Sequence, residues 1–366
     1  MEHDRRYLIF GPAYLDVVLE TESPLVTGDP PLLLDQSLLA LSATGRDDGM
    51  LEVDGPTGDR LLFPLPAAQA AMAATYHLAE PVLARLLGRD TTRTVNGTYP
   101  VAQFRSQLGG MGAGYAKAFG GLLRTPFGGS GDAPDVTGRQ VLGWLAQHAI
   151  RCAPVYLPDC TSDSSLVLLS ACGDKLAIGV REAMVHWRAA EEDRALVAEA
   201  AALVFCGAPN ALLATVLSWQ PGIPVMCAPA LRNVCDAAVP LAAQAEGIHY
   251  LAMNALEWAQ LTGRERLRDQ VPVISITDGP HGSRILFRDG EVYIPAQPYV
   301  GPANTNRAGE TYASTFFKVL LAEQPDFYRS GRVGEDVAAH AGAIATAQAT
   351  RQLAIQEFAF PPDDWR

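Results

Sequence analysis

The second half of the sequence alternates short apolar runs with helical patterns, and this alternation constrains the fold more than any other feature. The apolar runs have the length of buried strands and lie at Leu203–Cys206, Val225–Cys227, Tyr250–Ala252 and Val271–Thr277. The helical patterns lie at Ala195–Ala202, Leu256–Thr262, Glu310–Leu321 and Glu335–Gln352. Strands that alternate with helices predict an α/β fold with a mostly parallel sheet and helices on both of its faces.

Other segments extend this pattern toward the N-terminus and add hairpins. Tyr7–Phe10 predicts a short apolar strand, and after a bend at Gly11-Pro12 the segment Leu15–Leu19 continues in an extended form. A helical pattern covers Val141–His148. Two pairs of runs flank short turns and predict hairpins: Leu166–Ala171 with Leu176–Val180, and Arg284–Phe287 with Glu291–Ile294.

Residues 23–107 have a different texture. Short apolar runs at Leu32–Leu34, Leu38–Leu41, Met50–Val53 and Leu61–Leu65 are separated by turn signals. A helical pattern then covers about Ala67–Leu87. We expect residues 1–366 to form one large α/β domain, with residues 23–107 inserted as a small lid subdomain outside the main sheet.

Composition and charge exclude several classes of protein. The 40 acidic and 28 basic residues give a net charge of −12, which argues against a nucleic-acid partner, while 48% apolar residues exclude global disorder. The N-terminal apolar run reaches Gly11-Pro12 too soon for a signal peptide. The uncharged stretch Ala200–Leu231 is broken by two turns and predicts strand, helix and strand, with no membrane span. We therefore expect a cytoplasmic protein.

Cysteine and histidine spacing gives no metal-ligand pattern. The six cysteines contain no C-x-x-C pair, and the seven histidines contain no H-E-x-x-H motif. Scattered cysteines in a chain of this length are typical of core thiols in a reducing compartment.

A glycine-rich stretch, Gly109-Gly110-Met111-Gly112-Ala113-Gly114, leads into an amphipathic segment. Glycine lets the backbone approach a ligand closely, and a helix N-terminus offers free N–H groups. The stretch matches neither a phosphate-binding Walker motif nor a dinucleotide fingerprint. A ligand-binding loop and a plain turn are both compatible with it.

A second constellation opens the helix at Glu310–Leu321. Arg307-Ala308-Gly309-Glu310 places small residues where backbone N–H groups and the positive end of the helix dipole would face an anion. Such a nest suits a transferring phosphoryl group, and Glu310 suits a general base. The alternative is that Glu310 is only a favourable acid in a first helical turn.

Two further constellations follow predicted strands. Asn254 and Glu257 come directly after Tyr250–Ala252, and their oxygen atoms suit a hydrated magnesium ion, although the same spacing fits a helix capping box. Thr277-Asp278-Gly279-Pro280-His281-Gly282 joins two strands and suits a nucleotide-binding turn or a simple β-turn.

The order of these motifs resembles that of the PfkB carbohydrate kinases of the ribokinase-like superfamily. Gly11 to Asp16 is similar to the family's first strand, and Gly109, Gly110 and Gly114 are similar to its first signature of a double glycine followed by an asparagine. Gly131-Asp132 with Asp135 and Gly138, Phe205-Cys206-Gly207, and Pro229 with Arg232 match further family segments in order. Asn254 and Glu257 match its Asn-x-x-Glu motif, and Ala308-Gly309-Glu310 lies on its glycine-alanine-glycine-aspartate signature.

The resemblance implies a three-layer ribokinase-like sandwich and a kinase that uses ATP and Mg²⁺. It assigns Glu310 as catalytic base, with Arg307, Ala308 and Gly309 in the anion hole and Glu257 at the metal. It implies that Thr277, Gly279, Gly282 and Asn254 contact the nucleotide, and that Asp16, Gly109, Gly110 and Gly114 bind the acceptor. The long 23–107 region resembles the larger lid of adenosine kinases, so the acceptor class is a sugar or a nucleoside. A homodimer is also an expectation of the resemblance.

Several positions depart from the family pattern. Glu310 replaces the aspartate of the family's last signature, and Arg307 replaces the first glycine of that signature. Gly114 replaces the asparagine of the family's first signature. Positions 228 and 230 are both alanine. These changes are compatible with an unusual acceptor, and equally with a catalytically degenerate member that acts as a ligand-binding or regulatory module. A Rossmann-type dehydrogenase is disfavoured, because no G-x-G-x-x-G follows the first strand.

Overall fold

The computed structural model describes residues 7–21, 34–35, 43–45, 50–54, 60–64, 101–130, 133–170, 175–300, 305–355 and 358–365. The chain divides into two compact units. The first comprises Met1–Ala13, Leu108–Ser162 and Glu182–Arg366, and the second comprises Tyr14–Gln107 and Asp163–Arg181. Each unit is described by itself below.

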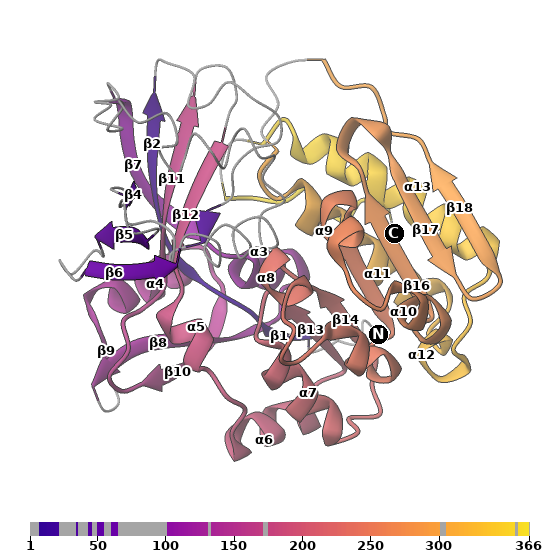
Figure 1. The fold of residues 1–366 in the computed structure, drawn as a ribbon. Helices are drawn as coiled ribbons and strands as arrows, with labels where there is room; N and C mark the ends of the chain where they lie inside the picture. The colour runs from indigo at the N-terminus through magenta and orange to yellow at the C-terminus, as the bar shows by residue number, and fades with distance from the viewer. Residues whose placement is uncertain are drawn as a thin grey trace. The chain divides into compact units, whose positions relative to one another are not determined.

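The first unit is built on a ten-stranded sheet (Figure 1). Its strand order is β10 (Arg151–Leu157), β8 (Leu122–Ser130), β1 (Tyr7–Phe10), β13 (Ala202–Cys206), β14 (Val225–Ala228), β15 (Tyr250–Asn254), β16 (Val273–Thr277), β17 (Ser283–Phe287) and β18 (Gly290–Ile294). The short β9 (Ala133–Pro134) pairs with β8. All neighbours from β10 to β16 are parallel, whereas β17 and β18 form the predicted antiparallel hairpin. The predicted mostly parallel sheet is confirmed.

Helices cover both faces of this sheet. The helices are α3 (Met111–Phe119), α4 (Val136–Gln147), α5 (Glu182–His186), α6 (Glu191–Glu199), α7 (Asn210–Ser218), α8 (Leu231–Val234), α9 (Ala255–Gln260), α10 (Arg264–Gln270), α11 (Ala308–Glu323), α12 (Phe327–Ser330) and α13 (Glu335–Gln352), with 3-10 turns η2 (Leu241–Gly247) and η3 (Gly279–His281). Tyr250 stacks on Phe316 and Phe317 of α11, whereas its neighbour Leu251 packs in the apolar cluster that contains α7 and α10 residues. Successive strand residues point to opposite faces, so α11 and the α7–α10 layer lie on opposite sides of the sheet.

Helix α6 begins earlier than the sequence pattern predicts. The pattern predicts a helix over Ala195–Ala202, but α6 covers Glu191–Glu199 and Ala202 begins β13. The Asp193 carboxylate accepts the Ala190 N–H at 2.7 Å and the Arg124 guanidinium at 2.6 Å, so it caps the helix and ties it to β8. Three acidic residues in the first turn also favour a start at Glu191, because they complement the helix dipole.

Other predicted boundaries shift as well, and α4 begins at Val136, five residues before the predicted Val141, because the Asp135 carboxylate accepts the Gly138 N–H at 2.7 Å and caps the helix there. Strand β16 begins at Val273, because Val271 lies at the C-terminal cap of α10. Helix α9 covers Ala255–Gln260 and ends where Leu261 adopts an extended conformation. Strand β13, helix α7 and strand β14 confirm the predicted strand, helix and strand within Ala200–Leu231. Within the described ranges, no helix has the length and hydropathy needed to cross a membrane.

The second unit contains two smaller sheets. One has the order β3 (Leu34–Asp35), β12 (Lys175–Val180), β11 (Ser164–Ser170), β2 (Tyr14–Thr21) and β7 (Val101–Gly109), and the other has the order β4 (Ala43–Gly45), β5 (Met50–Asp54) and β6 (Arg60–Pro64). The predicted 166–180 hairpin is antiparallel, but it belongs to this sheet rather than the main one. The predicted helix at Ala67–Leu87 lies outside the described residues. The lid assignment of residues 23–107 therefore stays a prediction.

Candidate active site

A cavity of about 210 Å³ lies in the first unit, where β14, β15 and β16 end and α11 begins. Its lining residues are Met111, Tyr115, Ala228, Pro229, Ala252, Met253, Asn254, Glu257, Ser275, Thr277, Gly309, Glu310, Tyr312 and Ala313. Five predicted site residues therefore meet here: Asn254, Glu257, Thr277, Gly309 and Glu310. They meet because parallel strands end at one edge of a sheet, which is where α/β proteins bind ligands. We call this the first cavity.

The start of α11 presents backbone amides to this cavity. Arg307 has a left-handed conformation (φ 67°), and its carbonyl accepts the first helical N–H, from Thr311, at 2.8 Å. The amides of Gly309 and Glu310 belong to the first turn, where no earlier helical carbonyl is available. Gly309 is exposed, and no atom lies within 4 Å of the position that a Cβ would occupy. Within the predicted nest at 307–310, the Ala308 N–H donates to the Thr305 carbonyl at 3.4 Å, which leaves the amides of Gly309 and Glu310 for a ligand.

Asn254 and Glu257 form the capping box that the sequence offered as the alternative to a metal site. The Asn254 side chain accepts the Glu257 N–H at 2.8 Å, and the Glu257 carboxylate accepts the Asn254 N–H at 2.9 Å. The pKa of Glu257 is raised to about 7, mainly by burial and also by the negative charge of Glu310, against the opposing effect of its hydrogen bonds with Asn254. Two carboxylates thus repel each other across one cavity.

The donor set around this pair determines what kind of metal it suits. In the part of the chain that the structure describes, no three His, Cys, Asp or Glu side chains gather as a metal site. Mg²⁺ is commonly held by one or two carboxylates together with substrate phosphates and water. The Glu257 carboxylate, the Asn254 amide and the nearby charge of Glu310 fit such a shared ion, and a metal held by protein alone does not fit.

Close backbone packing accounts for part of the glycine-rich stretch. Gly110 has φ 97°, and a Cβ on it would lie 2.3 Å from the Pro12 carbonyl oxygen. A Cβ on Gly112 would lie 2.5 Å from the Gly11 carbonyl carbon. Gly109 ends β7 and is buried. The glycines at 110 and 112 are therefore required by the fold, and their acceptor-binding role stays a prediction.

Gly114 lies next to two other predicted site residues. A Cβ on Gly114 would lie 3.5 Å from Glu310 Oε1 and 3.5 Å from Arg307 Nη1. The Arg307 guanidinium also donates to the Leu108 carbonyl at 3.2 Å and stacks on Phe358, with Cζ 3.7 Å from the ring centroid. Arg307 is thus held beside Gly114 and outside the lining of the first cavity. Its guanidinium occupies space into which a longer side chain at 114 would extend.

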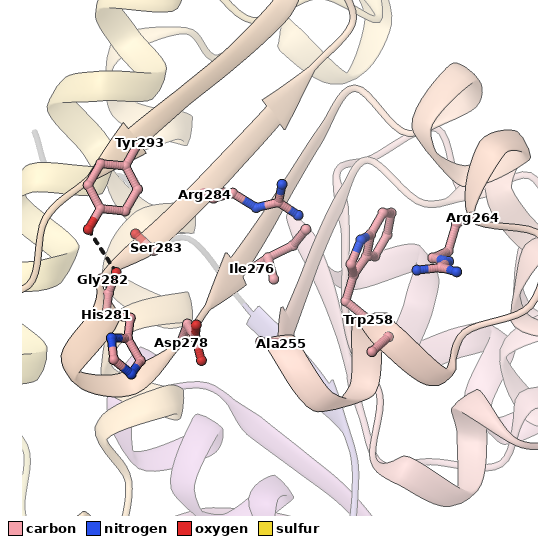
Figure 2. A pocket seen from close by; sticks show the side chains of 11 residues that line it. Ala255, Trp258, Arg264, Ile276, Asp278, His281, Gly282, Ser283, Arg284 and Tyr293 are labelled. Carbon is pink, nitrogen blue, oxygen red and sulfur yellow. Dashed lines mark hydrogen bonds between the residues drawn. The ribbon is translucent and has the colours of Figure 1, made fainter.

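The turn from Thr277 to Gly282 serves the fold as well as the site. The Thr277 hydroxyl donates to the Met253 carbonyl at 3.3 Å, and the Asp278 N–H donates to the Gly282 carbonyl at 2.8 Å. Gly279 and Gly282 have φ of 50° and 86°, and a Cβ on Gly282 would lie 2.3 Å from the Ile294 carbonyl oxygen. Thr277 lines the first cavity, whereas Gly282 lines a second one (Figure 2) and Gly279 lines neither.

Asp16, the predicted acceptor-binding carboxylate, lies in β2 of the second unit. It pairs in register with Ser165 of β11 and is half-buried. Its predicted role in binding the acceptor stays a prediction.

Among the lining residues that were not predicted as site residues, three carry hydroxyl groups: Tyr115, Ser275 and Tyr312. Tyr115 is fully buried, and burial together with the charge of Glu310 raises its pKa well above the usual value. Ser275 and Tyr312 contribute hydroxyls to the lining, and the Tyr312 hydroxyl is 2.9 Å from Ser283 Oγ. Ser275 precedes Thr277 by two residues in a strand, so a period of two would have placed both on one face.

Comparison with known proteins identifies the family of this chain. The model of the pfkB family carbohydrate kinases matches residues 83–356, more than half of the chain. Among curated proteins, none matches this sequence.

Solved structures share the fold at low sequence identity. A ribokinase from Giardia lamblia is 15% identical, with a TM-score of 0.65 over 97% of this chain and 94% of that one. A Burkholderia thailandensis nucleoside kinase in complex with inosine is 17% identical, with a TM-score of 0.58 over 96% and 92%. An Arabidopsis thaliana ribokinase complexed with ribose and ATP is 14% identical, with a TM-score of 0.59 over 96% and 94%. The order of the sequence motifs, the ribokinase-like fold and the family match agree, and the chain belongs to the pfkB family of carbohydrate kinases.

Proposed function

We propose that the protein transfers the γ-phosphoryl group of ATP to a hydroxymethyl group of a sugar or nucleoside. The observation that carries this proposal is the first cavity, in which the Glu310 carboxylate and the exposed amides at the start of α11 face the same space as Glu257. Phosphoryl transfer requires a group that positions the attacking hydroxyl and donors that stabilise charge on the transferring phosphoryl. These residues supply both.

In this mechanism Glu310 accepts the proton of the attacking hydroxyl as transfer proceeds. The amides of Gly309 and Glu310 stabilise the charge that develops on the phosphoryl oxygens, with the helix dipole adding to their effect. Thr277 and Asn254 lie at the ends of adjacent strands and orient the phosphates. The cavity of about 210 Å³ is smaller than a typical site for a whole ligand, so it suits the triphosphate end of the nucleotide. The rest of ATP would follow the Thr277–Gly282 turn, including Gly279 and Gly282.

Magnesium fits the same site. Glu257, with a pKa of about 7, and Asn254 would hold the ion together with the phosphates. When bound, Mg²⁺ neutralises phosphate charge and aligns the oxygens of the transferring group. A cation between Glu257 and Glu310 would offset their repulsion and favour the charged form of Glu257.

Arg307 takes part on the acceptor side. Its guanidinium is held beside Gly114 and Glu310, where the family signature has an asparagine side chain at 114. We propose that Arg307 supplies the hydrogen-bond donor that Gly114 lacks, while Asp16, Gly109 and Gly110 bind other acceptor hydroxyls. The solved relatives that bind ribose and inosine support the choice of sugars and nucleosides as the acceptor classes. A cytoplasmic location and a homodimer stay part of this proposal.

Two observations favour a second function, a catalytically degenerate ligand-binding or regulatory module. The capping box already uses a Glu257 oxygen and the Asn254 side-chain oxygen, and Arg307 holds a left-handed conformation that is usual for glycine. A module that keeps nucleotide binding without transfer would tolerate both features.

Glu310→Gln separates the two functions. The assay is ADP release from Mg-ATP with a panel of ribose, fructose, adenosine and inosine, and calorimetry measures nucleotide binding independently. We expect wild-type transfer to at least one acceptor and a loss of at least 100-fold in kcat for Glu310→Gln, with the dissociation constant for Mg-ATP changed less than threefold. Glu335→Gln is the matched control, because Glu335 is an exposed acid in the first turn of α13.

Two other outcomes would count against the proposed mechanism. Full activity of Glu310→Gln removes Glu310 from the mechanism. Nucleotide binding by the wild type without transfer to any acceptor favours the degenerate module.

A further inference from the structure

A second cavity, of about 410 Å³, lies at the ends of β16 and α9 in the first unit (Figure 2). Its lining residues are Ala255, Trp258, Ala259, Arg264, Ile276, Asp278, His281, Gly282, Ser283, Arg284 and Tyr293. The volume lies within the range of sites that hold small metabolites. The proposed mechanism places ATP along the Thr277–Gly282 turn, which contributes Asp278, His281 and Gly282 to this lining, and it assigns no role to the other lining residues.

The two cavities lie on opposite faces of the same strand. Ser275 and Thr277 line the first cavity, whereas Ile276 and Asp278 line the second. Side chains of a strand alternate between its two faces, so β16 and the residue that follows it form a shared wall. A ligand in the second cavity would therefore contact the reverse side of the proposed phosphate site.

The first turn of α9 also borders both cavities. Asn254 and Glu257 line the first cavity, whereas Ala255 and Trp258 line the second. The first turn of α9 thus carries the proposed magnesium ligands on one side and the Trp258 indole on the other. A small movement of this turn would change both cavities together.

The second cavity is positively charged on an acidic protein. Its lining includes two guanidinium groups, of Arg264 and Arg284, and one carboxylate, of Asp278, whereas the whole chain carries a net charge of −12. Within the described residues, neither guanidinium group has a hydrogen-bond or ion-pair partner. Arg284 pairs in register with Ile276 and with Tyr293, so its side chain lies on the same face of the sheet as theirs. Guanidinium groups without protein partners are suited to bind carboxylate or phosphate in two-pronged fashion.

An aromatic surface lies between the two charges. Figure 2 shows the Trp258 indole between the guanidinium groups of Arg284 and Arg264, with Ile276 beside it. Tyr293 borders the cavity, and its hydroxyl donates to the His281 carbonyl at 2.9 Å. A flat ring could stack on the indole while its charged group pairs with an arginine. An inorganic anion would leave this apolar surface uncovered.

We propose that the second cavity binds an anionic metabolite with a flat ring, of the class of nucleoside monophosphates, and that its occupancy changes the affinity of the first cavity for Mg-ATP. The regulatory part of this proposal rests on the proposed function, whereas the binding part does not. A buried hydrogen bond joins the two cavities, because Ser283 lines the second, Tyr312 lines the first, and their hydroxyls are 2.9 Å apart. Ser283 therefore carries part of the coupling.

Binding is tested by fluorine NMR on the full chain labelled with 5-fluorotryptophan. The protein has five tryptophans, and Trp258→Phe identifies the resonance of Trp258. The probes are AMP, phenyl phosphate, adenosine and inorganic phosphate. We expect AMP and phenyl phosphate to shift this resonance saturably, with affinity reduced at least tenfold in Arg264→Ala/Arg284→Ala. The control Arg266→Ala/Arg268→Ala removes the same charge from α10 at positions outside the cavity lining, and it should retain the affinity.

Further arms separate the two cavities. Gly309→Ala alters the proposed phosphoryl nest and should leave the AMP-induced shift unchanged. A shift that persists in Arg264→Ala/Arg284→Ala, or that disappears in Gly309→Ala, would overturn the second cavity as the site. Inorganic phosphate that binds as tightly as AMP, or adenosine that does so, would overturn the ligand class.

Coupling is measured separately as the dissociation constant of Mg-ATP with and without saturating AMP, by calorimetry. We expect at least a threefold change in the wild type, no change in the Arg264→Ala/Arg284→Ala variant, and a reduced change in Ser283→Ala with AMP binding retained. An unchanged constant in the wild type overturns the regulation. Because this readout needs no turnover, it is independent of whether the proposed kinase activity is found.

Discussion

Gly309→Ala separates the stability of α11 from its proposed function. Gly309 is exposed in the first turn of α11, and no atom lies within 4 Å of its Cβ position, so the fold accommodates alanine. Glycine in a helix costs about 0.5–1 kcal/mol relative to alanine. The variant should therefore gain up to about 1 kcal/mol in free energy of unfolding, which for a chain of this size raises Tm by about 1 °C.

The same methyl group should damage phosphoryl transfer. It would stand at the amides of Gly309 and Glu310, where the proposed mechanism places the transferring phosphoryl group. Loss of one such donor typically costs 10²- to 10³-fold in kcat, or about 2.7–4 kcal/mol. We therefore expect kcat to fall by about 100-fold or more while Tm rises, measured by a coupled ADP assay and by thermal denaturation.

Gly143→Ala is the matched control. Gly143 is exposed within α4, and the position of its Cβ is equally open. It should give the same gain in Tm with no change in kcat. Full activity of Gly309→Ala together with the raised Tm would refute the assignment of these amides to the transferring phosphoryl. A lowered Tm would refute the open geometry at Gly309.

Three further predictions test individual contacts. The pKa of Glu257 is higher in the folded than in the unfolded protein, so the free energy of unfolding of the wild type should fall between pH 4.5 and about 7. Glu257→Gln should flatten this fall, because glutamine can keep the cap with Asn254 but does not titrate. An unchanged pH slope in urea denaturation would contradict this. Arg307→Gly should raise the acceptor KM about tenfold with less effect on the KM for ATP, and Arg307→Gly/Gly114→Asn should partly restore it; steady-state kinetics in which only the ATP KM changes would place Arg307 on the phosphates instead. Phe358→Leu should lower the free energy of unfolding by about 0.5–1 kcal/mol, since Arg307 loses its aromatic partner, and an unchanged denaturation midpoint would show that the stacking contributes nothing.

Local patterns in the sequence predicted the main sheet and the edge at which its site lies. Strands at 203–206, 225–227 and 250–252 are apolar because both faces of the sheet are covered, and buried strands have this signature whatever their neighbours. Asn254, Thr277 and Glu310 follow strands or open a helix, so their meeting at one edge could be expected from chain order alone. Helix α6 was misplaced, because its start depends on Asp193 pairing with Arg124, which is 69 residues away in sequence.

The tertiary structure decided what the local patterns left open. The sequence alone determined an α/β chain of the pfkB type, with candidate groups in the right order. Only the folded chain shows that Asn254 and Glu257 cap α9 while Glu310 raises the pKa of Glu257, that Gly110 and Gly112 pack against residues 11 and 12, and that two cavities share one strand. Periodicity along a chain reports which face of an element is buried, whereas charge, close packing and shared walls depend on distances between residues far apart in sequence.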